Sequence, residues 1–165
     1  MSVKKIAYLG IGIALYMVLG LVMNIPLLAG SHIQTDLGYI AFGAFCFLFG
    51  WEACIVGIIG CFIESLIVSG WVPVGWMLGQ LFIGVVCGIA YKKFNQRWVQ
   101  IAVTIIAVFI GIGIIKTAVE CVLYSIPVLV KFPKNFVAFI ADVIPMIVGL
   151  FIGVMLKSRL KLEEG

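Results

Sequence analysis

The chain has 165 residues, of which 64% are hydrophobic and 11% are charged, and its formal net charge is +4. Soluble domains carry about 25% charged residues, so this composition excludes a soluble globular protein. The basic residues stand in short clusters at the ends of apolar segments, which is typical of membrane topology signals and not of nucleic-acid binding.

Six apolar segments are predicted to cross the lipid bilayer as helices, because a crossing helix needs about 20 apolar residues. In chain order they cover residues 6–23, 37–50, 53–69, 74–91, 98–123 and 136–156. The second segment is short, so it either starts deeper in the protein or spans a locally thin region. The first is followed by Asn24-Ile25-Pro26 and lacks a small-residue cleavage site, so we expect it to be retained. The prediction is a single all-α domain over residues 1–165, a bundle of six transmembrane helices.

The distribution of lysine and arginine predicts how this bundle is oriented. Three basic clusters fall on one side of it: Lys4 and Lys5, then Lys92, Lys93 and Arg97, then Lys157, Arg159 and Lys161. Cytoplasmic loops carry an excess of basic residues, so we expect both termini in the cytoplasm. Residues 24–36, 70–73 and 124–135 are then outer loops. Lys131 and Lys134 fall outside, so the bias is clear but incomplete.

Motifs that indicate catalysis or a metal site are missing from the sequence. The five cysteines are spread singly, no CxxC pair occurs, and His32 is the single histidine. This pattern argues against both a disulfide framework and a zinc site. The chain also has no HExxH, GxSxG or Walker motif. We therefore expect that the protein is not an enzyme, has no cofactor and carries no ATP site of its own.

Four charged residues lie inside the apolar segments, namely Glu64, Lys116, Glu120 and Asp142. A charge at membrane depth costs roughly 3 to 10 kcal/mol, so these groups must meet each other, a ligand or water. Lys116 and Glu120 are four residues apart, so they share a helix face and can pair. In the predicted topology all four lie in the outer half. They form either a ligand pocket open to the outside or an internal network, Lys116 with Glu120 and Asp142, that only joins the last two helices.

The residues around these charges indicate what a pocket would bind. Three carboxylates face one ammonium, and Asp36 is a further candidate, so we expect a ligand with amine or N–H donors and not a free phosphate. Trp71 and Trp76 flank a Gly/Pro turn and either stack on a ligand or mark the membrane interface. Neutral hydrogen bonds are available from Ser65, Gln80 and Asn135. The predicted substrate-binding residues are Asp36, Glu64, Trp71, Trp76, Gln80, Lys116, Glu120 and Asp142.

Small residues at helical spacing predict close contacts between helices, because they let backbones approach within a membrane. The glycine pairs are Gly57/Gly60, Gly75/Gly79, Gly84/Gly88 and Gly149/Gly153. In the first helix Ala7, Gly10 and Ala14 form a flat stripe at spacings of three and four. This stripe faces either the bundle core or a separate membrane partner.

Three short motifs, the chain length, the six apolar segments and the polar segment 24–36 are together similar to those of a known group. The motifs are Asp36-Leu37-Gly38-Tyr39-Ile40, Leu48-Phe49-Gly50 and Gly57-Ile58-Ile59-Gly60. Over nearly its whole length the chain resembles the substrate-binding S components of energy-coupling factor (ECF) vitamin transporters. That family docks on a transmembrane coupling subunit through an Ala-x-x-x-Ala patch in its first helix. The matching spacing here is Gly10-x-x-x-Ala14, with Ala7 on the same face.

The resemblance implies a mechanism and a set of partners. S components bind a vitamin from outside with high affinity, under the loop that corresponds to residues 24–36. They then topple in the membrane as they dock on the coupling subunit, which two ATPase subunits drive. It implies a multi-pass protein of a prokaryotic plasma membrane, with a small water-soluble vitamin or nucleobase-like ligand.

The acidic, aromatic character of the predicted pocket favours some nutrients over others. Pyridoxine-like, pyrimidine-like and deazapurine compounds suit it better than a flavin phosphate or a folate. The alternative function is a non-transporting scaffold subunit of a membrane assembly, in which the buried charges are structural and no small molecule binds.

Overall fold

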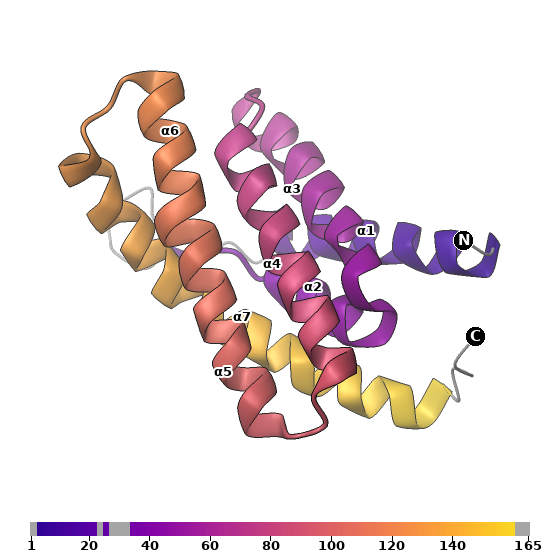
Figure 1. Cartoon of the computed structure of the whole chain (residues 1–165). Helices are drawn as coiled ribbons and strands as arrows, with labels where there is room; N and C mark the ends of the chain where they lie inside the picture. Colours follow the sequence, from indigo (N-terminus) through magenta and orange to yellow (C-terminus); the bar gives the residue numbers. More distant parts are fainter. Residues whose placement is uncertain (1–2, 23–24, 27–33, 161–165) are drawn as a thin grey trace.

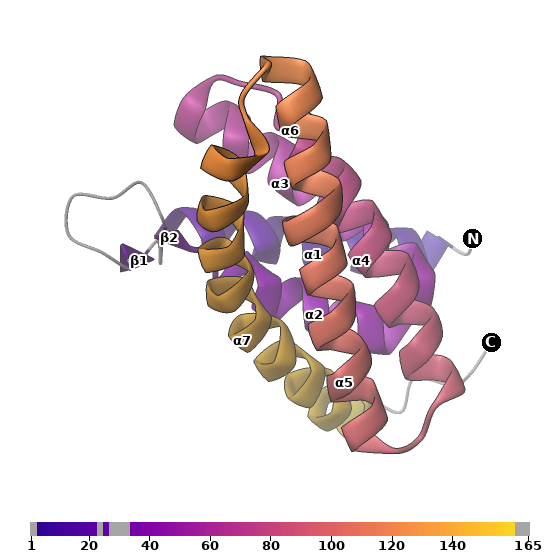
Figure 2. The same cartoon turned by 60° about the vertical axis from the view of Figure 1, so that its left-hand side comes forward.

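Helices make up nearly all of residues 3–22, 25–26 and 34–160, the part of the chain that the computed structural model describes (Figure 1). In chain order they are α1 (Val3–Val22), α2 (Gly38–Phe49), the 3-10 helix η1 (Gly50–Ala53), α3 (Cys54–Ser69), α4 (Val74–Lys93), α5 (Arg97–Val108), the π-helix η2 (Phe109–Lys116), α6 (Thr117–Tyr124) and α7 (Val128–Leu160). Two short strands, β1 (Ile25–Pro26) and β2 (Gln34–Thr35), pair antiparallel. β2 lies beside α7, as Figure 2 shows.

Five helical stretches in the described residues are long and apolar enough to cross a membrane: Val3–Val22, Gly38–Ser69, Val74–Lys93, Arg97–Tyr124 and Val128–Arg159. The prediction of an all-α protein is thereby confirmed. The second stretch contains two of the predicted helices, because only η1 separates α2 from α3. α2 and α3 pack against each other, because a Cβ at Gly57 of α3 would lie 2.8 Å from the Phe42 ring of α2. The count of six crossings stays a prediction.

The start of the last helix was predicted wrongly. Residues 124–135 were expected to form an outer loop, but α7 begins at Val128, and only residues 125–127 separate it from α6. Lysines, an asparagine and Pro133 made this segment resemble a loop. The structure uses its polar residues inside a helix, where Asn135 is buried and bonds to α6. Backbone amides of Val130 and Lys131 bond to the Pro127 carbonyl and begin the helix.

Glycines bring the helices into backbone contact, as their spacing predicts. A Cβ atom at Gly149 of α7 would lie 2.2 Å from the Ile40 carbonyl oxygen of α2. A Cβ at Gly88 of α4 would lie 2.3 Å from the Gly50 carbonyl carbon of η1. Because these neighbours are backbone atoms, the two positions require a residue without a side chain.

One end of the bundle, at the bottom of Figure 1, holds the turn from α4 into α5, with the basic residues Lys92, Lys93 and Arg97. Lys5 forms an ion pair with Glu52, the Lys92 side chain packs on Gly50, and the Arg97 guanidinium lies 5.2 Å from the centre of the Phe47 ring. The opposite end, which we call the outer end, carries the turns between α3 and α4 and between α6 and α7. This separation matches the predicted arrangement of charge, and the assignment of the basic end to the cytoplasm stays a prediction.

Candidate functional site

Polar side chains near the outer end form two clusters. The members of the outer cluster are Trp76, Lys116, Thr117, Glu120, Lys131 and Asn135. The members of the deep cluster are Tyr16, Asp36, Tyr39, Gln80 and Asp142. On α4, Trp76 and Gln80 are one turn apart, about 6 Å, and on α7, Asn135 and Asp142 are two turns apart, about 10 Å. The clusters are therefore stacked along the bundle, one above the other.

The outer cluster is a buried network of charges that joins α6 to α7. Glu120 accepts from two ammonium groups, Lys116 at 3.3 Å and Lys131 at 3.2 Å. Asn135 accepts from Lys116 and donates to Thr117 at 2.9 Å. The predicted pairing of Lys116 with Glu120 is confirmed, and it follows from their spacing of four residues.

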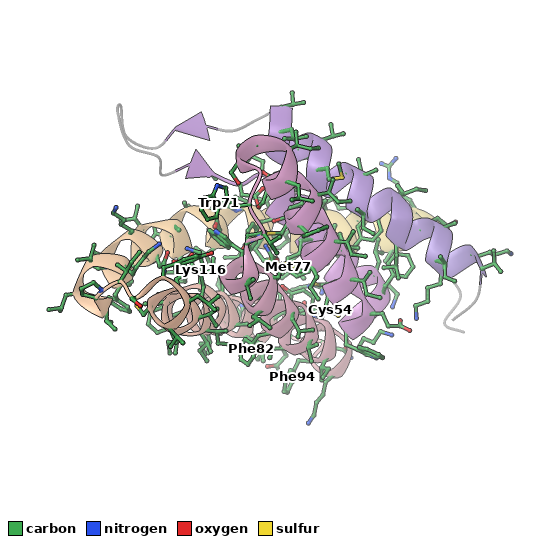
Figure 3. The ribbon with its side chains drawn as sticks, turned by 90° about the horizontal axis from the view of Figure 1, so that it is seen from above. Cys54, Trp71, Met77, Phe82, Phe94 and Lys116 are labelled. Atoms are coloured by element: carbon green, nitrogen blue, oxygen red, sulfur yellow. The ribbon has the colours of Figure 1, made fainter. Side chains whose placement is uncertain are left out.

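Two further features fix the position of Lys116. It ends the π-helix η2, and π-helical turns occur often at functional sites. Its ammonium lies 4.2 Å from the centre of the Trp76 ring, close enough for a cation–π interaction. Figure 3, which looks onto the outer end, labels Lys116. On its α4 side the outer cluster therefore consists of the Trp76 ring, and the Lys116 ammonium covers one face of this ring.

The deep cluster joins α1, the start of α2, α4 and α7 through Asp36. The Tyr16 hydroxyl donates to the Asp36 carboxylate at 2.6 Å, and the Gln80 amide donates to the Tyr16 hydroxyl at 2.9 Å. The other carboxylate oxygen of Asp36 accepts from the Gly38 N–H at 2.7 Å, which caps the first turn of α2. The Asp36 N–H donates to the Asp142 carboxylate at 3.2 Å. Asp142 therefore contacts Asp36 directly, and not Lys116 and Glu120 as the predicted network had it.

Two atoms of the deep cluster are buried without a hydrogen-bond partner among the described residues. They are the side-chain oxygen of Gln80 and the hydroxyl of Tyr39. A buried polar atom left unpaired costs about 1–3 kcal/mol, so native proteins rarely keep one without a water or ligand to pair with it. The deep cluster therefore has an unused capacity for hydrogen bonds.

Of the remaining predicted site residues, Glu64 interacts electrostatically with Asp36 of the deep cluster, and Trp71 lies at the surface. Glu64 is half-buried, and a Cβ at Gly20 of α1 would be 2.6 Å from its carboxyl group, so it faces α1. Trp71 is 69% exposed at the turn between α3 and α4. Neither side chain makes a hydrogen bond to the two clusters within the described part of the chain. His32 and its neighbours 27–33 lie outside the described residues.

Sequence reasoning missed Tyr16, Tyr39, Thr117 and Lys131 as members of the clusters. Tyr16 and Tyr39 resemble ordinary core aromatics, and Lys131 was assigned to a loop. The one available signal was a hydroxyl group inside an apolar helix, which needs a partner there. No group of three or more His, Cys, Asp or Glu side chains that could hold a metal ion occurs within the ranges 3–22, 25–26 and 34–160.

The pH dependence of stability is expected to depend on Asp36. Burial raises the pKa of its carboxyl from 3.8 to about 6, although hydrogen bonds from Tyr16 and Gly38 act to lower it. The folded state then binds this proton more tightly than the unfolded state. Its contribution to stability is full below about pH 4 and is lost as the pH rises through 6, by about 2–3 kcal/mol. Thermal unfolding in detergent from pH 4 to 7 should show this slope.

The Asp36→Asn variant should reduce that slope, because asparagine does not titrate. An Asp36→Asn protein with the wild-type pH profile would contradict a raised pKa at this residue.

The sequence profile of one family, "ECF-type riboflavin transporter, S component", matches residues 1–162. The chain belongs to this family of S components. The resemblance seen in the sequence is thereby confirmed, and this S component is a substrate-binding subunit of a membrane transporter. The family implies a small vitamin ligand and the modules of an ECF transporter as partners.

Several bacterial proteins are similar to this S component. A UPF0397 protein of Streptococcus thermophilus is 25% identical over 171 residues, which cover 96% of this chain and 93% of the relative. A UPF0397 protein of Lactobacillus acidophilus is 30% identical over 99 residues, which cover 59% of this chain and 52% of the relative. One of Onion yellows phytoplasma shares the same identity and coverage. The multi-pass, prokaryotic character expected of the chain fits these bacterial relatives.

Proposed function

We propose that this S component captures a small, nitrogen-containing vitamin or nucleobase-like nutrient from outside the cell, with high affinity, for ATP-driven import by an ECF module. Membership of the family supports the role. The observation that carries the ligand-binding part is the deep cluster, because α1, α2, α4 and α7 meet there with two polar atoms unpaired.

The charges of the two clusters support a ligand with N–H donors. Asp36 and Asp142 give the deep cluster carboxyl oxygens that accept hydrogen bonds, which favours a ligand with N–H donors over a free phosphate or carboxylate. In the outer cluster Glu120 is already bonded to Lys116 and Lys131, so these lysines are less available to an anion. We propose that the outer cluster is a wall of the site and that Trp76 offers its other face for stacking.

Riboflavin is the first candidate, because the family description names it. It carries no phosphate, and its ring system has both an N–H group and carbonyl oxygens. It therefore meets the requirement for donors, as pyrimidine-like nutrients do. A flavin phosphate or a folate would bring anionic groups that the deep cluster disfavours.

A thermal-shift screen of the purified protein tests the proposal. The ligands are riboflavin, pyridoxine, thiamine, biotin, folate and the common nucleobases. A ligand at 100 times its dissociation constant should add about 2.7 kcal/mol of stability. Asp142→Asn should lose this gain, and Glu52→Gln at the basic end should retain it. A wild-type protein that no ligand stabilises would support the scaffold alternative instead.

We further propose that the stripe of Ala7, Gly10 and Ala14 docks on the coupling subunit. All three residues are exposed, and a Cβ at Gly10 would meet nothing within 4 Å, so the stripe faces away from the core. This exposure favours a separate membrane partner, one of the two possibilities that the sequence left open. The basic end, where α1 begins, is then proposed to face the cytoplasm and the ATPases.

Gly10→Leu and Ala14→Leu are expected to bind ligand normally but to reduce uptake at least tenfold in cells that have the ECF module. A leucine fills the flat surface that small residues leave for a close helix contact. The matched control is Ala118→Leu on the exposed face of α6, which should transport normally. Normal uptake by both stripe variants would show that docking takes place elsewhere.

A further inference from the structure

The turn between α4 and α5 carries positive charge that no described carboxylate neutralises. Lys92, Lys93 and Arg97 are all exposed, and none of them forms an ion pair among the described residues. Residues 65–119 contain no Asp or Glu, and Glu52, which also lies at this end of the bundle, is already paired with Lys5. The charge of this turn is therefore available to an anionic partner.

Arg97 is held in place by neutral partners. It donates to the side-chain oxygen of Gln100 at 2.7 Å, and its guanidinium lies 5.2 Å from the centre of the Phe47 ring. Gln100 is 1% exposed, and its amide nitrogen donates to the backbone oxygens of Tyr91 at 3.2 Å and Phe94 at 2.6 Å. A buried amide and a ring thus orient the guanidinium and leave its charge uncompensated. Its remaining N–H donors suit a phosphate group.

An exposed apolar face of α4 runs up from these charges. Counted back from Lys93, this face consists of Ile89, Val85, Leu81 and Leu78, at spacings of four and three residues. Ile89 is 52% exposed, Leu81 40% and Leu78 42%. The face is about 22 Å long, more than the depth of hydrocarbon in one leaflet, which is about 15 Å. It therefore offers lipid chains a continuous surface that ends in a lysine.

α5 combines charge and apolar surface in the same way. Trp98, next to Arg97, is 82% exposed, and the exposed residues Ala102, Ile105 and Ile106 follow on the same side of the helix. Tryptophan at the end of an apolar helix is typical of the interface between membrane and water. The turn therefore lies at the depth of the lipid headgroups, which favours a phospholipid over a soluble anionic partner.

We propose that the turn between α4 and α5 binds an anionic phospholipid from the leaflet at the basic end. Arg97 and Lys93 hold its phosphate, and its acyl chains lie along the exposed faces of α4 and α5. A zwitterionic headgroup binds less well, because its own cation is repelled by these residues. The proposed docking stripe is on α1, which packs on α2 and α3, so the lipid and the coupling subunit use different helices.

Native mass spectrometry of the purified full chain tests this proposal. The probes are phosphatidylglycerol and phosphatidylcholine with the same acyl chains. We expect phosphatidylglycerol to bind at least about tenfold more tightly, since each Lys or Arg near an anionic headgroup raises affinity about fivefold. Arg97→Gln and Lys93→Gln should each lower this preference by about fivefold, and the double variant should bind both lipids about equally.

Two further variants serve as controls. Lys134→Gln removes one exposed positive charge near the outer end and should change the preference less than about twofold, because charges that far apart are screened. Arg97→Lys keeps the charge and should retain most of the preference. All variants should unfold near the wild-type temperature in neutral detergent, since the changed side chains are exposed.

Three results would overturn the inference. The first is equal binding of the two lipids by the wild type, or an equal loss of preference in Lys134→Gln and Arg97→Gln. The second is competition by free glycerol phosphate as strong as that by phosphatidylglycerol, which would indicate a site for soluble phosphate. The third is a double variant that keeps its lipid preference but no longer assembles with the ECF module, which would assign the turn to a protein partner. The proposed nutrient binding stands in each case.

Discussion

Replacing Gly149 with valine is expected to prevent α7 from docking on α2 and to abolish the recovery of folded protein. The Cβ atom would lie 2.2 Å from the Ile40 carbonyl oxygen and 3.0 Å from the Ala44 nitrogen. Both are backbone atoms, so no side chain can rotate to relieve the overlap. Overpacking a close-packed core costs about 1–3 kcal/mol, and more where a backbone must move, which is the case here. The yield of the monodisperse peak in size-exclusion chromatography in detergent measures the effect.

The control for this prediction is the same substitution at Gly10. A Cβ there would have no neighbour within 4 Å, so Gly10→Val should give the wild-type yield and thermal stability. The pair compares one chemical change at a buried and at an open glycine. Equal yields of the two variants would mean that α2 and α7 do not pack as described.

Glu120→Ala is expected to destabilise the protein by about 3 kcal/mol, because it leaves two ammonium groups of the outer cluster without their carboxylate. Removing one partner from a buried ion pair is far more costly than the pair itself is stabilising. Lys116→Met should cost less, since Glu120 then keeps its contact with Lys131. Thermal unfolding of the ligand-free variants in detergent measures which of the two substitutions costs more stability.

A matched ion pair at the other end of the bundle provides the reference. Glu52 pairs with Lys5, whose side chain is more exposed than that of Lys116. Glu52→Ala should therefore cost less than about 1 kcal/mol. If Glu120→Ala cost no more than Glu52→Ala, the outer cluster would not be the buried clamp between α6 and α7 that its geometry indicates. Adding Lys116→Met to Glu120→Ala should restore part of the lost stability, because one unpaired charge is removed.

The parts of this structure that depend on local chemistry were predictable from the sequence. Except for the last one, the apolar segments became helices with boundaries close to those expected, since their length and composition decide whether they can enter a bilayer. Lys116 and Glu120 pair because four residues separate them on one helix. The glycines at Gly84/Gly88 and Gly149/Gly153 make the close contacts that their spacing predicts.

The same local reasoning predicted the wrong start for α7. Prolines and lysines are ordinarily signs of a loop, and nothing in segment 124–135 itself shows that Asn135 has partners on α6. The favourable bonds that extend the helix come from residues about 15 to 20 positions earlier in the chain. A prediction made from one segment at a time has no access to them.

The partner of Asp142 was also beyond local reasoning. It depends on how deep α2 begins, because the backbone of Asp36 meets Asp142 only if α2 starts well below the outer end. The sequence showed that the second apolar segment is short and left both explanations open. Asp36, two residues before the start of α2, bonds to Asp142 near the middle of α7. This contact agrees with the explanation that the second segment starts deep in the protein.

Asp36 stands one residue after β2 and two before α2, and it also holds α1 through Tyr16 and α7 through Asp142. Any outward movement of β2 must therefore pull on α1, α2 and α7 at the same time. We infer that the ligand-free protein opens locally more often than the ligand-bound protein. A bound ligand should then slow this opening even at distant backbone amides. Hydrogen–deuterium exchange along α1 should become slower when the vitamin is added, and unchanged exchange there would show that α1 is not coupled to Asp36 in this way.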